Sequence, residues 1–479
     1  MKVLVANRGE IACRIFKSLR QEEMQSVAIY APDETEAEHT LMADVAIALQ
    51  GERPYLNGEQ ILSIAKENKV DAIHPGYGYL SENADFAEQC LEAGITFIGP
   101  SADAMRLLGN KAKARALAES QNIPVVPGAQ ACQSVEQAQE LAQSLTYPLL
   151  LKAAAGGGGK GMRLVQNAEG LSQGFSAAQH EALNAFGDDQ VLLEQWINPA
   201  RHIEVQILSD GENVIALGER ECSLQRRYQK IVEESPAPGA NDELRQKLFD
   251  AAKTIVKAAA YKNAGTVEFL VGPNNDFYFL EVNTRLQVEH PVSEYCFGVD
   301  LVAWQLAIAQ GAQIDFEPQS NGHAIEVRIN AEAPYSGFLP QSGDVAHLDW
   351  PNHPFVRIDT GVREGNQISS HYDPMIAKMI AWGDTRTQAI ARLKGALQQT
   401  TILGVETNQT FLLDVLEQEF FTQGQTFTTT IEEKSWERPQ IDEDILAQIP
   451  TGQGVHTKSS GQQEQASPFT TLNGFRVGP

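Results

Sequence analysis

The chain has 479 residues, with 62 acidic against 37 basic side chains and a formal net charge of −25 at pH 7. This length exceeds what one hydrophobic core usually supports, so we expect about three packed units. The negative charge argues against nucleic acid or an anionic membrane as the main partner. No stretch approaches the ~20 apolar residues that span a bilayer, and the first residues resemble a strand rather than a signal peptide, which favours a cytoplasmic protein.

The cysteines are scattered, odd in number and without CxxC spacing, so we predict that they fill the core rather than form disulfides, bind metal or act as nucleophiles. They are Cys13, Cys90, Cys132, Cys222 and Cys296.

The first hundred residues alternate short β-branched segments with amphipathic helical patterns such as 11–20, which predicts an open, largely parallel α/β sheet. The predicted strands are residues 3–6, 27–30, 45–49, 72–74 and 96–98. The turn after the first strand lacks the GxGxxG pattern, which disfavours a Rossmann-type dehydrogenase. The loop HPGYGYLSEN follows a strand, where such sheets bind ligands. Its Tyr77 and Glu82 could equally be surface residues.

A second unit begins near Lys111, and its strands at 148–152 and 162–165 flank a loop with four consecutive glycines. A P-loop needs Ser or Thr after its lysine and a helix next, and this loop has neither. We interpret it as a mobile flap that closes a hairpin and covers phosphates with its amides. Lys111 and Lys152 would add point charges to those phosphates.

Residues 266–270 and 276–282 flank a Gly-Pro-Asn-Asn turn, which predicts antiparallel strands. A turn centred between Asn274 and Asn275 places Glu268 opposite Glu281. If the extended conformation continues, one face carries Glu281, Asn283, Arg285, Gln287 and Glu289. Two facing carboxylates destabilise a buried hairpin unless a cation lies between them, and Mg²⁺ prefers such oxygen ligands.

Two further segments have open alternatives. Glu194 ends a predicted strand at a plausible adenine and ribose edge, or it belongs to an ordinary turn. The run that holds Arg220, Arg226, Arg227 and Lys230 is either an anion site or a solvated basic face.

A third unit begins at Gly322. It contains an alternating strand that exposes Arg328, and the segment HYDPMIAKMIAWG leading to a helix at 387–399. Residues 451–466 lack large apolar side chains and are typical of a flexible linker.

The ordered motifs ANRGEIACRI, HPGYGYLSEN, KAAAGGGGKGM, EVNTRLQVEHPV, RINAE and HYDPMIAK closely resemble the biotin carboxylase component of biotin-dependent carboxylases, in the ATP-grasp superfamily. The resemblance covers roughly the first 430 residues. GGGGKGMR, TGVREG and HYDPMIAK look more like the α subunits of acyl-CoA carboxylases of the methylcrotonyl-CoA type. An acetyl-CoA carboxylase component, another ATP-grasp ligase such as a carbamoyl phosphate enzyme, and a nucleotide-binding scaffold without turnover are the alternatives.

The resemblance implies a three-part ATP-grasp fold of mixed α/β and α+β class. Its parts are a Rossmann-like N-terminal domain at 1–112, an ATP-grasp domain at 113–321 with its lid at about 131–203, a C-terminal α+β domain at 322–445, and a linker at 446–479 that includes the start of a truncated following domain.

The implied activity is ATP-dependent carboxylation of protein-linked biotin by bicarbonate through carboxyphosphate. The implied cofactors are ATP, Mg²⁺ or Mn²⁺, and biotin supplied by a carrier domain outside this chain. The implied partners are that biotinyl carrier domain, a carboxyltransferase subunit and further copies of the chain. No AMKM-type biotin acceptor occurs in the sequence.

The resemblance also assigns roles to residues. ATP would be held by Lys111, Lys152, Gly157, Gly158, Gly159, Met162, Glu194, Ile197, His202 and Gln225. The metal would be held by Glu268, Glu281 and Asn283, and bicarbonate by Lys230, Arg285, Gln287 and the backbone of Val288. The catalytic residues would be Lys230, Arg285, the general base Glu289 and Arg328, with Tyr77 and Arg328 beside biotin. We expect burial to raise the pKa of Glu289 toward neutrality. Tyr228 and Gln195 replace a histidine and a lysine of the stand-alone bacterial subunit.

Overall fold

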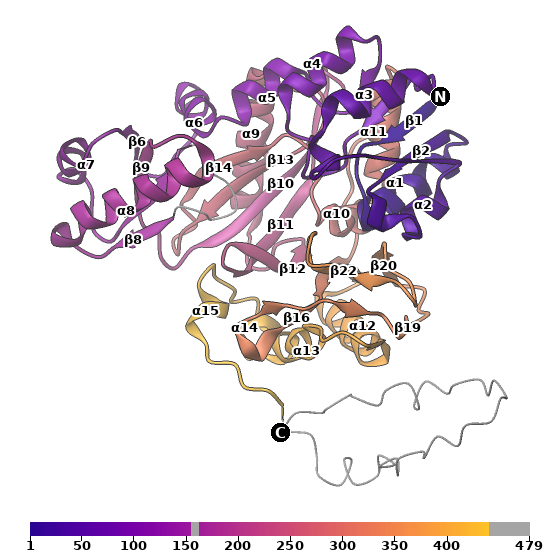
Figure 1. The fold of residues 1–479 in the computed structure, drawn as a ribbon. Helices are drawn as coiled ribbons and strands as arrows, with labels where there is room; N and C mark the ends of the chain where they lie inside the picture. Colours follow the sequence, from indigo (N-terminus) through magenta and orange to yellow (C-terminus); the bar gives the residue numbers. More distant parts are fainter. Residues whose placement is uncertain (155–161, 440–479) are drawn as a thin grey trace.

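The computed structural model describes residues 1–154 and 162–439. Figure 1 shows an indigo N-terminal part, a magenta lobe that projects to one side, a central sheet and an orange C-terminal part below it. The expectations for Gly157, Gly158, Gly159 and the segment 446–479 fall outside the described residues.

The N-terminal part is a five-stranded parallel sheet in the order β3-β2-β1-β4-β5, as predicted. Its strands are β1 (Lys2–Val5), β2 (Gln25–Tyr30), β3 (Val45–Ala48), β4 (Ala72–His74) and β5 (Thr96–Phe97), and its helices are α1 (Gly9–Gln21), α2 (Glu38–Met42), α3 (Gly58–Glu67) and α4 (Ala84–Glu92). The Asn7 amide donates to the carbonyls of Pro75 and Tyr77, at 2.8 and 2.7 Å. This joins the ends of β1 and β4 and fixes the loop that carries Tyr77.

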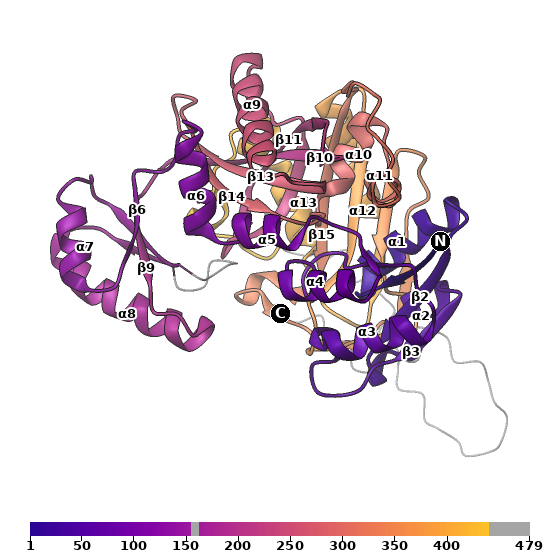
Figure 2. The same ribbon diagram turned by 90° about the horizontal axis from the view of Figure 1, so that it is seen from above.

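Helices α5 (Ala102–Leu108) and α6 (Lys111–Ser120) lead to the projecting lobe, which stands apart from the body in Figure 2. The lobe is a four-stranded antiparallel sheet in the order β6-β9-β7-β8, with two helices. Its elements are β6 (Gly128–Cys132), α7 (Val135–Ala142), β7 (Leu149–Ala153), β8 (Arg163–Val165), α8 (Ala168–Phe186) and β9 (Val191–Gln195). Strands β7 and β8 pair directly, so the glycine loop joins two strands and not a strand and a helix.

The central sheet has eight antiparallel strands in the order β14-β13-β10-β11-β12-β15-β22-β20. These strands are β10 (Arg201–Ser209), β11 (Val214–Arg226), β12 (Gln229–Ser235), β13 (Asn263–Val271), β14 (Phe277–Asn283), β15 (His323–Asn330), β20 (Val356–Thr360) and β22 (Met375–Gly383), with helices α9 (Asp242–Ala258), α10 (His290–Phe297) and α11 (Leu301–Ala309). Because β12 pairs with β15, the sheet continues from the central part into the C-terminal part. Residues of β15 therefore lie beside those of β12.

The C-terminal part packs helices on one face of β15 and β22. Ile325, Val327 and Ile329 point into that core, each at 0% exposure, while Glu326 and Arg328 alternate to the opposite face. The remaining elements are β16 (Glu332–Ala333), β17 (Leu339–Pro340), β18 (Gly343–Asp344), β19 (His347–Asp349), β21 (Gln367–Ile368), α12 (Arg386–Gln399), β23 (Thr401–Leu403), α13 (Gln409–Glu417), α14 (Glu419–Thr422) and α15 (Thr430–Glu433).

All five cysteines are buried, which agrees with the predicted role as core residues. Within residues 1–154 and 162–439, every helix is too short or too polar to cross a bilayer.

Candidate active site

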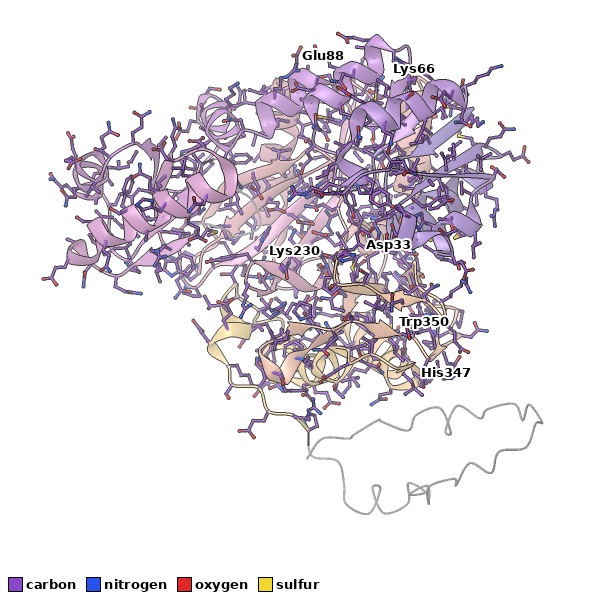
Figure 3. All side chains as sticks on the ribbon, viewed as in Figure 1. Asp33, Lys66, Glu88, Lys230, His347 and Trp350 are labelled. Atoms are coloured by element: carbon purple, nitrogen blue, oxygen red, sulfur yellow. The ribbon has the colours of Figure 1, made fainter. Side chains whose placement is uncertain are left out.

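A cavity of about 1780 Å³ lies where the N-terminal part, the lobe and the central sheet meet. Lys230 of β12 and Asp33 after β2 both line it, and Figure 3 shows these two side chains near the middle of the molecule. The cavity also receives most of the predicted site residues. They are Tyr77, Lys111, Lys152, Met162, His202, Gln225, Glu268, Glu281, Asn283, Arg285, Gln287, Val288, Glu289 and Arg328.

Glu268 and Glu281 are directly opposite each other on β13 and β14, as predicted. The turn itself is tighter than predicted, because Val271 pairs with Phe277. An irregularity in the register between Glu268 and Phe269 inserts one residue in β14 and restores the expected pairing.

This carboxylate pair extends into a row across four strands. Glu268 pairs with Glu204 of β10, and Glu204 pairs with Arg220 of β11. Arg220 is fully buried and its Nε donates to Glu204 at 2.5 Å. The sequence reasoning missed Glu204, although its alternation with His202 in β10 places both on one face. Arg220 is therefore neither a solvated residue nor a free anion site.

Lys230 is the cation at the centre of the carboxylates. Its Nζ lies 2.5 Å from Glu204, 2.9 Å from Glu268 and 2.6 Å from Glu289. Burial disfavours the charged lysine, but the three carboxylates outweigh burial and raise its pKa. Lys230 therefore stays charged in the pocket.

Two other lysines that line the cavity pair with carboxylates. Lys111 contacts Glu281, and Lys152 contacts Glu194. Glu194 is buried at 8% exposure, and neither it nor Ile197 lines the cavity itself.

His202 is held on both sides of its ring. Its Nε2 lies 3.1 Å from Glu268, and its Nδ1 lies 2.7 Å from the Gln225 amide. Burial lowers the pKa of His202, but Glu268 more than compensates and the net shift is upward. His202, Gln225 and Glu268 thus form one connected wall.

The expectation of a continuous extended face beyond Asn283 is wrong, because β14 ends there. The loop nevertheless brings the predicted side chains together. Arg285 donates to the Gln287 amide oxygen at 2.6 Å and to the Asn283 oxygen at 3.1 Å. Gln287 donates to Glu268 at 3.2 Å, and Glu82 accepts from Arg285 Nε at 3.2 Å. Glu82 is thereby part of the site.

Glu289 precedes α10 and lies 2.9 Å from the Arg328 guanidinium. The expected rise in its pKa is wrong for this state. Burial does favour the neutral acid, but Lys230, Arg328 and Arg220 together outweigh burial and lower the pKa of Glu289. Arg328 also contacts the buried carboxylate of Glu233.

The remaining residues of the basic segment from Arg220 to Lys230 lie partly at the cavity and partly on the protein surface. Arg226 pairs with Glu332 at 3.1 Å, Arg227 is exposed, and Tyr228 lines the cavity while keeping 47% exposure.

The paired strands offer a suitable ligand set for a hard divalent cation. Glu268, Glu281 and Asn283 line one cavity, and their oxygens are of the type that such a cation prefers, although the Asn283 oxygen accepts from Arg285 in this structure. Lys111 and Lys230 compensate the two carboxylates in this structure, so a bound cation would share or replace these contacts.

Three family profiles match the chain in order: the biotin carboxylase N-terminal domain at 1–105, the carbamoyl-phosphate synthase L chain ATP-binding domain at 110–316, and the biotin carboxylase C-terminal domain at 326–433.

Known relatives agree with these profiles. The chain is 41% identical to the mitochondrial methylcrotonoyl-CoA carboxylase subunit alpha of Dictyostelium discoideum, over 99% of this chain and 70% of the relative. It is 45% identical to biotin carboxylase 1 of Bacillus subtilis, over 90% of this chain and 98% of the relative.

Solved structures show the same fold. A biotin carboxylase complex from Campylobacter jejuni superposes with a TM-score of 0.88 at 40% identity, over 90% of this chain and 98% of that chain. The biotin carboxylase domain dimer of the Hydrogenobacter thermophilus 2-oxoglutarate carboxylase gives 0.88 at 42% identity, over 90% of this chain and 97% of that chain. The chain belongs to the biotin carboxylase family.

Proposed function

We propose that this chain is the biotin carboxylase part of a biotin-dependent acyl-CoA carboxylase, and that it carboxylates protein-linked biotin with bicarbonate at the expense of ATP. The observation that carries the proposal is one cavity in which Lys230 contacts Glu268 and Glu289 while Arg328 contacts Glu289 from the neighbouring strand. A nucleotide site, an anion site and a second substrate site then share one wall.

The acyl-CoA type is supported by the motifs and by the methylcrotonoyl-CoA relative, whose match extends over 99% of this chain. We propose the functional units 1–112, 113–321 and 322–445, which the profile limits support. A biotinyl carrier domain, a carboxyltransferase subunit and a second copy of the chain are the proposed partners. The Hydrogenobacter thermophilus domain is described as a dimer, which supports the proposal of a second copy of the chain.

We assign Lys111 and Lys152 to the ATP phosphates. Each lysine now pairs with a carboxylate, Glu281 or Glu194, and can exchange it for a phosphate oxygen at little cost in charge. We assign Met162, Glu194, Ile197, His202 and Gln225 to the adenosine part. The phosphates are also assigned to Gly157, Gly158 and Gly159, which lie outside the described residues. Glu268, Glu281 and Asn283 would hold Mg²⁺ or Mn²⁺, which neutralises phosphate charge during transfer.

Bicarbonate is assigned to Lys230, Arg285, Gln287 and the backbone of Val288. The planar guanidinium of Arg285 can bind it with two hydrogen bonds. Glu289 accepts the bicarbonate proton, and the freed oxygen forms a bond to the γ-phosphorus as the bond to ADP breaks. Carboxyphosphate results. Glu289 is a weak base while Lys230 and Arg328 both contact it, so its basicity rises when Lys230 turns to bicarbonate and Arg328 to biotin.

Carboxyphosphate then breaks its carbon–oxygen bond to give CO₂ and phosphate. Biotin N1 loses its proton, which the released phosphate can accept, and N1 bonds to the CO₂ carbon. The negative charge develops on the ureido oxygen. Arg328 supplies the fixed positive charge that stabilises this oxygen, and Tyr77 lines the same cavity.

The proposal is tested with the purified chain, Mg-ATP, labelled bicarbonate and free biotin. We expect ADP formation that requires bicarbonate and rises with biotin, together with acid-labile label on biotin. ATP turnover that requires ammonia and ignores biotin would indicate a carbamoyl phosphate ligase instead. Absence of phosphate release would indicate a nucleotide-binding scaffold.

A further inference from the structure

A fully buried lysine contacts the loop from Arg285 to Glu289, which is assigned to bicarbonate. Lys378 of β22 has 0% exposure, and its Nζ donates to the Val288 carbonyl at 2.8 Å. Lys378 comes from the HYDPMIAK segment, to which the proposed mechanism assigns no step. Burying an ammonium is costly unless hydrogen bonds and an opposite charge compensate it.

Asp359 and Glu326 interact with the charge of Lys378, and a third carboxylate comes from the N-terminal part. Glu10, in the first turn of α1, lies 3.4 Å from Lys378 Nζ and also accepts the hydroxyl of Tyr77. Glu10 is 6% exposed, and its second carboxylate oxygen has no hydrogen-bond partner in the part of the chain that the structure describes. Lys378 therefore connects Tyr77 and Glu10 with Val288.

Backbone packing fixes this connection in space. The N-terminal part approaches the C-terminal part so closely at Gly361 that a Cβ there would lie 2.4 Å from the Gly9 carbonyl carbon. Helix α1 packs on β20, whose Asp359 is directly opposite Lys378. Glu10 and Lys378 are thus held together by main-chain packing as well as by charge.

Each carbonyl of the loop from Leu286 to Glu289 has a hydrogen-bond donor. The Gln287 carbonyl is 2.7 Å from the His290 ring, and Lys378 provides the contact for the Val288 carbonyl. The two flanking side chains, Gln287 and Glu289, both point at the cations and carboxylates of the site. The Val288 carbonyl belongs to the peptide that joins Val288 to Glu289, so a rotation of this peptide would change the direction of the Glu289 side chain.

We infer that Lys378 is a positioning residue. Its hydrogen bond fixes the Val288 carbonyl, and thereby the loop assigned to bicarbonate. Through Glu10, Lys378 also links this loop to Tyr77. This inference rests on the proposed function, because it specifies the anion that the loop receives. Removal of Lys378 alone leaves Glu10 buried without its partner and lowers stability, so the test must separate a loss of geometry from a loss of stability.

The decisive variant is Lys378→Met, which retains an unbranched apolar stem and removes the ammonium. We expect the KM for bicarbonate to rise about tenfold or more, with the KM for ATP within about twofold of wild type, because Lys378 contacts Val288 and Glu10 and none of the described residues assigned to ATP. Lys394→Met is the matched control, since Lys394 pairs with Glu417 at 2.8 Å outside the cavity. Equal losses in all parameters together with a lower Tm would overturn the inference.

The double variant Glu10→Gln with Lys378→Met distinguishes the loss of the Val288 contact from the effect of an unpaired Glu10 carboxylate. It removes the uncompensated carboxylate, so thermal stability should recover relative to Lys378→Met while the bicarbonate KM stays high. Recovery of the bicarbonate KM would contradict the inference, because the Val288 contact is still missing. If the wild-type chain hydrolyses no ATP with bicarbonate, the proposed function itself has failed, and that result is distinguishable from an unchanged KM in an active enzyme.

Discussion

Glu268 and Glu281 are directly opposite each other in the β13–β14 pair, and each carboxylate is compensated by a different lysine. Lys230 compensates Glu268 from β12, and Lys111 compensates Glu281 from the start of α6. Two like charges at this spacing destabilise a hairpin unless cations accompany them. We conclude that the hairpin is built around positive charge, which the proposed metal and nucleotide would redistribute.

The first prediction concerns the metal. Glu281→Gln removes a ligand charge but keeps the shape of the side chain, so the Mg²⁺ concentration needed for half-maximal ATP hydrolysis should rise about tenfold or more. A titration of ATPase activity against Mg²⁺ measures this. Glu243→Gln on the exposed surface of α9 is the control, and an unchanged Mg²⁺ requirement in Glu281→Gln would remove Glu281 from the metal site.

A second prediction separates the two half-reactions. Arg328→Ala should keep most of the bicarbonate-dependent ATP hydrolysis, because loss of its contact raises the pKa of Glu289 and so does not weaken the base. It should reduce biotin carboxylation about a hundredfold or more, because the ureido oxyanion loses its fixed positive charge. Both rates are measured on the same preparation. A parallel fall of the two rates would show that Arg328 acts at the phosphoryl step as well.

Glu289→Gln should abolish both reactions, a loss of roughly 10²- to 10⁴-fold, because a neutral amide cannot accept the bicarbonate proton. The variant keeps the length of the side chain, but its single amide oxygen can accept from only one of Lys230 and Arg328. Normal turnover of ATP with bicarbonate in this variant would exclude Glu289 as the base.

A fourth prediction concerns the pH dependence of stability. Glu233 and Glu326 are directly opposite each other on β12 and β15, and both are fully buried. Burial raises the pKa of Glu233 from 4.5 to about 7, and burial also raises the pKa of Glu326. The folded state therefore binds more protons than the unfolded state between pH 4.5 and about 7, so stability falls as pH rises through that window.

The variant Glu233→Gln should flatten that dependence. The wild type should lose about 1–3 kcal/mol of unfolding free energy between pH 5 and 7 through this site, and the variant should lose much less. Denaturant titrations at both pH values measure the difference, with the exposed Glu52→Gln as control. An identical pH slope in wild type and Glu233→Gln would contradict the assignment.

The sequence predicted the N-terminal strands and the pairing of Glu268 with Glu281 because both depend on local alternation and turn chemistry. The positions of Arg285, Gln287 and Glu289 could not be predicted in the same way. The strand ends at Asn283, and contacts with residues distant in the sequence, such as Glu268, fix the loop that follows.

The pKa values and the charged partners of the site residues were the properties that the sequence predicted least well. The pKa of Glu289 depends on Lys230, Arg328 and Arg220, which come from three other strands. Lys378 resembles any lysine in a strand until the fold brings Glu10 and Val288 to it.

The central claim is that a bicarbonate oxygen attacks the γ-phosphorus in this cavity, and isotope transfer tests it most directly. The purified chain is incubated with Mg-ATP, biotin and ¹⁸O-labelled bicarbonate, and the released phosphate is analysed by mass spectrometry. The mechanism predicts that each phosphate gains one oxygen from bicarbonate. Phosphate that contains only oxygen from ATP and water would contradict it.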